Sequence, residues 1–211
     1  AGVDEPFYAA YLAMTGLDHP LRDEITASQT QDVNIVAASL SGSNSPQKAH
    51  FYQKHMTQHM IDGVPRDWMR DVTNVFLIRH PARVIASYAA KRENPNLDDI
   101  GFRQQAELFD LVKSWGQAPV VIDSHDIRDD PESMLKKLCT RIGLDFRPEM
   151  LTWPTGGHKD DGAWASHWYG AVWKSTGFAG AEGPLPDIPP ELQPVLDAAL
   201  PYYEQMKAEK L

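Results

Sequence analysis

Residues 73–90, TNVFLIRHPARVIASYAA, carry the clearest indication of the fold class. The apolar run at 75–78 predicts a short buried strand. Pro81 suits the first position of a helix, because its missing N–H would have no partner there. Ile85 and Tyr88 follow at helical spacing. The segment therefore predicts a strand, a tight turn and a helix, which is a building unit of α/β folds.

The turn after this strand carries a residue suited to binding a phosphate. Ligands of α/β sheets bind at the carboxyl ends of the strands, which is where Arg79 stands. Its guanidinium can hold a phosphate with two hydrogen bonds, and the next helix offers free N–H groups to an anion. Ser87, two turns into that helix, can add a hydroxyl donor. The alternative is an ordinary strand–helix unit with a structural arginine.

Arg79, Pro81 and Ser87, as R-x-P-x5-S after a strand, resemble the 3′-phosphate-binding element of sulfotransferases that use 3′-phosphoadenosine 5′-phosphosulfate (PAPS). The resemblance implies a three-layer α/β/α fold with a central, mostly parallel sheet of the P-loop NTPase-like kind. It also implies one sulfotransferase-like domain over residues 1–211. In that family the arginine and serine hold the 3′-phosphate of PAPS, and Arg83 would assist them.

A second block adds to the resemblance. An apolar strand at 118–122 precedes an acidic turn, and D-P-E at 130–132 opens a helix that closes at Gly143. The same order of strand, acidic pair, D-P helix and final L-x-F occurs in sulfotransferases. By periodicity alone, this block predicts only another strand–helix unit.

Two residues are candidates for the base that removes a proton from the acceptor. Glu5 lies in D-E-P-F, which resembles an acidic segment of bacterial sulfotransferase-like proteins. The alternative is a helix that starts at Asp4 and uses its acidic residues only as caps. His55 ends a strand predicted at 49–55 and matches the His of the family's K-x-H, while Lys54 is displaced by one position. Lys54 would stabilise the charge on the bridging oxygen.

The same segment also allows a metal site. His55 and His59 are four residues apart, with His50 nearby, as in helical zinc sites. Met56 stands where zinc peptidases carry a glutamate, so a metal site here would lack its base. We therefore expect no metal.

Residues 154–180 are rich in Gly, Trp and His and predict a lid or a pocket wall. Gly162 and Trp164 resemble the end of the Gly-rich basic loop that closes the family's cofactor site, and Lys159 would supply its cation. The family's Arg-Lys-Gly opening of that loop is absent. Wall packing without cofactor contact is the alternative.

Length, net charge, apolar runs and cysteine content limit the classes to which the protein can belong. The 211 residues predict a single domain, and a net charge of −9 argues against a broad nucleic-acid surface. No apolar run reaches the ~18 residues of a membrane span. Cys139 is the only cysteine, which excludes an internal disulfide and fits a reducing compartment such as the cytoplasm.

The leading hypothesis is transfer of a sulfuryl group from PAPS to a hydroxyl or amine of a small-molecule acceptor. The alternatives are a P-loop nucleotide or small-molecule kinase and a sulfotransferase-like binding protein without activity. The family's phosphosulfate loop would precede Asp4 by about one helix. We therefore expect roughly 20–30 further residues upstream, the length of a strand–helix unit.

Overall fold

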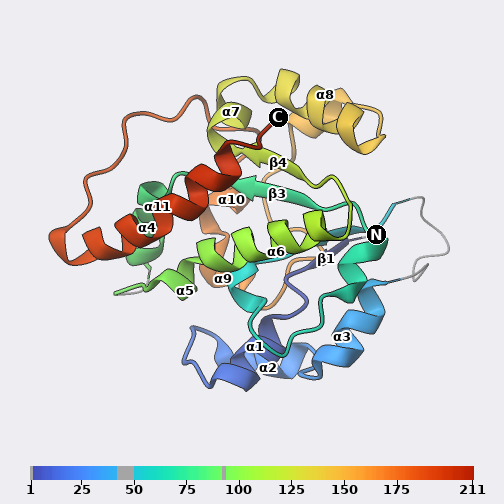
Figure 1. Cartoon of the computed structure of the whole chain (residues 1–211), viewed down its shortest axis with the longest axis vertical. Helices are drawn as coiled ribbons and strands as arrows, with labels where there is room; N and C mark the ends of the chain where they lie inside the picture. Colours follow the sequence, from blue (N-terminus) through green and yellow to red (C-terminus); the bar gives the residue numbers. More distant parts are fainter. Residues whose placement is uncertain (1, 42–49, 92–93) are drawn as a thin grey trace. The chain divides into compact units, whose positions relative to one another are not determined.

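The computed structural model describes residues 2–41, 50–91 and 94–211 (Figure 1). Contacts among them divide the chain into two compact units. Unit 1 comprises Ala1–Val72 and Pro154–Thr176, and unit 2 comprises Thr73–Trp153 and Gly177–Leu211. Each unit combines helices with a pair of parallel strands, which confirms the predicted α/β class. That residues 1–211 form one domain stays a prediction.

Unit 1 contains the strands β1 (Gly2–Asp4) and β2 (Tyr52–Lys54), which pair in parallel with Asp4 opposite Lys54. Its helices are α1 (Tyr8–Thr15), α2 (Arg22–Ser28), α3 (Val33–Leu40), α9 (Ala165–Trp168) and α10 (Gly170–Lys174), with the 3-10 helices η1 (Thr57–His59) and η2 (Asp67–Asp71). Helix α1 ends at Gly16, whose φ of 68° is the left-handed conformation that glycine adopts most readily.

The first helix starts later than Asp4, where the acidic residues suggested a start. Asp4 belongs to β1, and α1 begins only at Tyr8. The pairing with β2 extends past β1, because the N–H of Glu5 donates to the carbonyl of Lys54 at 2.8 Å. Glu5 then takes a φ of 42°, which turns the chain toward α1. A strand partner about fifty residues away thus overrides the local capping signal.

The core of unit 1 lies where α1 and α2 meet. Tyr8, Leu12, Ile25 and Trp164 pack together there, and each is at most 3% exposed. Burying a side chain such as Leu12 stabilises the fold by roughly 1.5–3 kcal/mol. Gly162 permits the position of Trp164, since a Cβ at residue 162 would lie only 2.0 Å from the indole ring.

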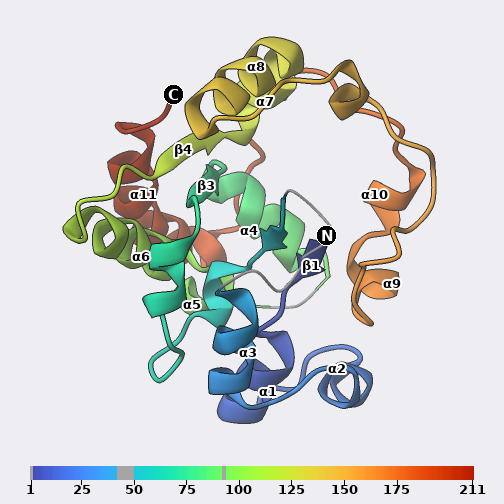
Figure 2. The ribbon, with the colours of Figure 1, turned by 90° about the vertical axis from the view of Figure 1, so that its right-hand side faces the viewer.

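Unit 2 contains the strands β3 (Val75–Ile78) and β4 (Val120–Asp123), paired in parallel with Ile78 opposite Asp123. Its helices are α4 (Pro81–Ala89), α5 (Leu97–Ile100), α6 (Phe102–Ser114), α7 (Ser124–Asp129), α8 (Pro131–Ile142) and α11 (Gln193–Lys207), with η3 (Pro148–Leu151) and η4 (Pro190–Leu192). Helix α11 packs along α6, and α7 follows directly from β4 (Figures 1 and 2).

The predicted strand, turn and helix of unit 2 are confirmed by β3 and α4, but the strand is only half-buried, because Val75 and Leu77 are exposed. His80 caps α4, because its Nδ1 accepts the N–H of Ala82 at 3.2 Å, and Pro81 takes the first helical position. The apolar spacing of residues 98–115 predicts one long helix, and this prediction is wrong. Gly101, with a φ of 70°, divides that stretch into α5 and α6. Within the described residues, no helix is both long and apolar enough to cross a membrane.

Candidate functional site

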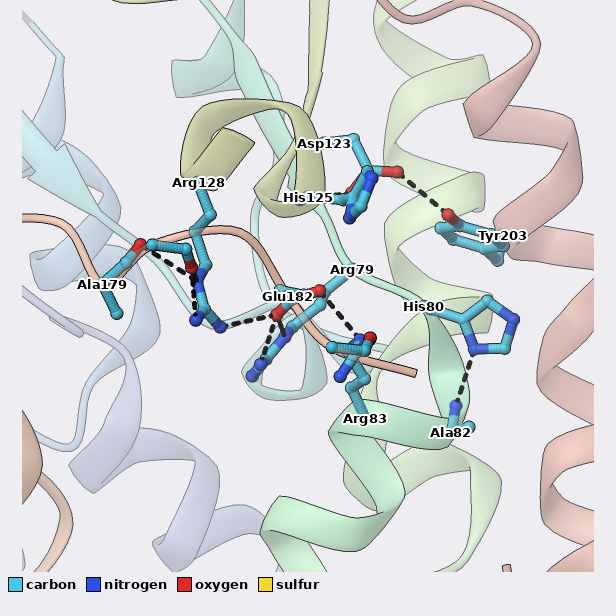
Figure 3. A network of polar contacts seen from close by, with 12 residues as sticks. Arg79, His80, Ala82, Arg83, Asp123, His125, Arg128, Ala179, Glu182 and Tyr203 are labelled. Carbon is cyan, nitrogen blue, oxygen red and sulfur yellow. Dashed lines mark hydrogen bonds and ion pairs between the residues drawn. The ribbon is translucent and has the colours of Figure 1, made fainter. Parts of the chain in front are cut away.

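Three arginines gather at the carboxyl ends of β3 and β4, and we call Arg79, Arg83 and Arg128 the arginine cluster (Figure 3). Arg79 follows the last residue of β3, and Arg83 lies in the first turn of α4. Arg128 lies in α7, which begins directly after β4. Because the two strands are parallel, their carboxyl ends meet at one edge, where α/β proteins bind their ligands.

The arginine cluster surrounds one carboxylate, that of Glu182. Arg79 donates to its Oε1 from Nε at 3.0 Å and from Nη2 at 2.6 Å, and Arg128 donates to the same oxygen at 3.0 Å. Arg83 Nε lies 2.8 Å from the other oxygen, Oε2. The Glu182 side chain is only 2% exposed. Burial alone would raise the pKa of this carboxyl, but the hydrogen bond and charge of Arg79, with the charges of Arg83 and Arg128, lower it overall.

The arginine cluster brings together two of the predicted phosphate ligands, Arg79 and Arg83. Ser87 is exposed and lies four residues after Arg83 on α4, the spacing that puts both on the same face of the helix. Arg128 was missed by the sequence reasoning. Its signal was weaker, since Arg79 directly follows its strand whereas Arg128 lies near the end of α7, a helix that the sequence did not predict. Glu182 had no such signal, because it comes from irregular chain 103 residues after Arg79.

A cavity of about 340 Å³ adjoins the arginine cluster. Its lining includes Arg83, Glu182 and two lysines of the C-terminal segment, Lys207 and Lys210. Asp123 forms part of the wall and accepts a hydrogen bond from Tyr203 at 2.9 Å (Figure 3). The cavity gives an anionic ligand room beside the guanidiniums.

Unit 1 holds a second polar group, the carboxylate cluster of Asp4, Glu5, Lys54 and Tyr169. Lys54 Nζ lies 2.5 Å from Glu5 Oε1 and 3.0 Å from Asp4 Oδ1. The Tyr169 hydroxyl lies 2.7 Å from Asp4 Oδ2 and 2.8 Å from Glu5 Oε1. Its single proton can therefore serve only one of the two carboxylates at a time.

The protonation of the carboxylate cluster follows from burial and charge. Burial raises the pKa of Glu5, and Lys54 offsets only part of that rise. Burial lowers the pKa of Lys54, but Glu5 and Asp4 outweigh it, so the lysine keeps its proton more firmly than usual. Burial and the charge of Glu5 raise the pKa of Tyr169, which stays a neutral donor. Glu5 is thus a carboxylate whose raised pKa suits proton acceptance.

His55 lies beside this cluster in an aromatic setting. Its ring stacks on Trp68 with 4.7 Å between centroids, and its Nε2 lies 3.2 Å from Gln53 Oε1. Burial, and then the charge of Lys54, lowers the pKa of His55 to about 4. The imidazole is therefore neutral near pH 7. Both predicted bases, Glu5 and His55, lie next to Lys54 in unit 1.

The residues predicted from the late Gly-rich segment have different surroundings. Trp164 is 1% exposed, and its Nε1 donates to the Tyr169 hydroxyl at 3.2 Å. Lys159 is exposed and lies 3.5 Å from Asp160 Oδ1. The deep burial of Trp164 favours the wall-packing alternative, and its contact with a cofactor stays a prediction.

The histidines at 55 and 59 do not share one α-helix, because only the short 3-10 helix η1 lies between them. His59 is buried and stacks on Tyr8 at 4.4 Å between ring centroids. Across residues 2–41, 50–91 and 94–211, no group of three or more His, Cys, Asp or Glu is placed to hold a metal.

The arginine cluster lies at the carboxyl edge of parallel strands, where α/β proteins bind ligands, and guanidiniums suit anions such as carboxylate and phosphate. The family model of the sulfotransferase domain matches residues 1–210, and the chain belongs to this family. The chain is 31% identical over 207 residues to branched-chain-amino-acid aminotransferase-like protein 1 of Arabidopsis thaliana and 29% identical over 205 residues to protein 2 of the same name. These matches cover 98% and 97% of the chain, but only 37% and 36% of the two relatives. No solved structure matches significantly.

Proposed function

We propose that the protein transfers a sulfuryl group from PAPS to a hydroxyl or amine of a small-molecule acceptor. Membership of the sulfotransferase domain family supports sulfuryl transfer. The observation that carries the donor assignment is the arginine cluster. Arg79, Arg83 and Arg128 surround the Glu182 carboxylate, so the chain itself shows that an anion fits there. Guanidinium forks match a phosphate at least as well as a carboxylate.

This geometry supports the following proposed roles for the donor-site residues. Arg79 and Arg83 bind the 3′-phosphate, Arg128 adds a third guanidinium, and Ser87 supplies a hydroxyl from the same face of α4 as Arg83. The wall of the neighbouring cavity that Arg83, Lys207 and Lys210 form receives an adjoining part of the donor. PAPS, when bound, supplies the sulfuryl group. Lys159 and Trp164 are further proposed contacts from the Gly-rich segment.

The acceptor side rests on the carboxylate cluster. Glu5 takes the proton from the acceptor hydroxyl or amine, and its raised pKa favours that proton transfer. Lys54 keeps its positive charge and stabilises negative charge on the bridging oxygen. His55, neutral near pH 7, is the second candidate base. We also propose a reducing compartment such as the cytoplasm, because the sequence has a single cysteine, Cys139, and so forms no internal disulfide.

Calorimetric titration of the full-length protein tests the donor assignment. Adenosine 3′,5′-bisphosphate is the probe, and 5′-AMP, which lacks the 3′-phosphate, is the comparison. We expect tight binding of the bisphosphate only. Arg79→Ala should weaken it by about 1.5–3 kcal/mol, or roughly 10- to 150-fold, because it removes charged hydrogen bonds.

Arg141→Ala is the matched control, since Arg141 is exposed on α8. Equal affinity for both nucleotides would remove PAPS from the proposal. Binding that requires Mg²⁺ would favour a kinase instead.

A further inference from the structure

Glu182, whose carboxylate lies inside the arginine cluster, belongs to a segment without helix or strand. Residues 177–189 form an irregular strap that joins the bridge between Thr152 and Gly177 to η4. Most of the strap is exposed, including Leu185 at 49%. The Glu182 side chain is the exception, at 2%. Glu182 is therefore the one polar side chain of the strap that is deeply buried.

The arginines also hold the strap by its backbone. Arg128 donates to the carbonyl of Gly180 from Nε at 3.0 Å and from Nη2 at 2.7 Å, and Arg83 donates to the carbonyl of Gly183. The guanidiniums that would bind a phosphate are thus the same groups that hold residues 180–183. These guanidiniums cannot bind a phosphate and the strap at the same time.

The charges in the arginine cluster are unequal. Three guanidiniums face one carboxylate, so one net negative charge meets three positive ones. A phosphate monoester carries about −1.5 to −2 at neutral pH and three acceptor oxygens, which satisfies three arginines better than a carboxylate does. Around Glu182, residues 179–181 and 183–185 are all exposed, so movement of that part of the strap uncovers little apolar surface.

We infer that Glu182 is an internal competitor for the ligand's phosphate: it occupies the arginine cluster in the free protein, and the phosphate has to displace it. This inference rests on the proposed assignment of the arginine cluster to the 3′-phosphate. Displacement multiplies the apparent affinity for every ligand that enters the cluster by the fraction of molecules in which the cluster is open. Small anions that bind weakly therefore do not occupy the arginine cluster, whereas a phosphate that accepts several hydrogen bonds still binds.

A positioning role for Glu182 makes the opposite prediction. If the carboxylate served only to hold the guanidiniums in place, its removal would disorder them and weaken phosphate binding. The sign of the change in affinity therefore separates competition from positioning.

The test is calorimetric titration of the full-length protein with adenosine 3′,5′-bisphosphate and with 5′-AMP. Glu182→Gln keeps the size of the side chain and removes its charge. We expect it to raise affinity for the bisphosphate by about 10-fold, as for a cluster that is open in roughly a tenth of molecules. Asp187→Asn is the matched control, because Asp187 is an exposed carboxylate on the same strap.

Unchanged or weaker bisphosphate binding by Glu182→Gln, with 3′-phosphate-dependent binding by wild type, would overturn the inference and leave the proposed function standing. Failure of both proteins to prefer the bisphosphate would overturn both. Hydrogen–deuterium exchange of the wild-type protein gives a check that needs no variant. The bisphosphate should increase exchange at residues 178–189, whereas protection there would contradict displacement.

Discussion

Replacing Tyr169 by Phe tests whether the carboxylate cluster is held as the contacts indicate. The hydroxyl lies 2.7 Å from Asp4 Oδ2 and 2.8 Å from Glu5 Oε1, and it accepts from Trp164 Nε1 at 3.2 Å. Tyr169→Phe keeps the ring and removes all of these contacts. A hydrogen bond to a charged group is worth about 1.5–3 kcal/mol.

The lower part of that range applies to Tyr169→Phe, because Lys54 still bonds both carboxylates. We therefore expect a loss of about 2 kcal/mol in the free energy of unfolding. For a chain of this length, that corresponds to a fall in Tm of about 4–8 °C. Thermal and urea denaturation both measure the change.

Tyr52→Phe is the matched control for Tyr169→Phe. Tyr52 is 70% exposed, so its hydroxyl already faces water and its removal should cost little. If the two variants unfold at the same temperature, the Tyr169 hydroxyl does not hold the cluster, and Glu5 loses the surroundings that we assign to it.

The remaining predictions concern protonation and packing in unit 1. His55 has a pKa of about 4 in the folded protein and about 6.5 when unfolded, so the unfolded chain binds more protons between these values. Stability should fall as the pH drops from 6.5 to 4, by up to about 3 kcal/mol, and His55→Gln should lose that part of the pH dependence in denaturant titrations. An identical pH dependence in both proteins would count against a neutral His55 imidazole. Gly162→Ala should destabilise the protein by about 1–3 kcal/mol or more, because the new Cβ meets the ring of Trp164 at 2.0 Å. Gly180→Ala, which meets open space, is its control in the same Tm measurement, and equal effects would contradict the packing argument.

Local sequence signals were sufficient for the elements of unit 2 that position Arg79 and Arg83, but not for α7, which carries Arg128 where the sequence predicted an acidic turn. The apolar run before Arg79 and the proline after it gave β3 and α4, because strand, turn and N-terminal helix preferences are all local. Gly101 ended a helix where periodicity suggested continuation, since its left-handed φ breaks the hydrogen-bond pattern.

The residues that complete both clusters could not be predicted in this way. Glu182 reaches Arg79 across 103 positions, and Tyr169 reaches Glu5 across 164. Neither residue lies in a periodic pattern that indicates its partner. The place of Asp4 in β1 could not be predicted locally either, because it depends on pairing with Lys54. Long-range contacts of this kind are fixed by the tertiary fold, which local propensity does not encode.

The most direct test of the central claim is an experimental structure of the full-length protein with adenosine 3′,5′-bisphosphate. We predict that the 3′-phosphate oxygens lie within hydrogen-bonding distance of Arg79 and Arg83 and that Glu182 has left the arginine cluster. A bisphosphate bound elsewhere, with Glu182 still between the guanidiniums, would contradict the account.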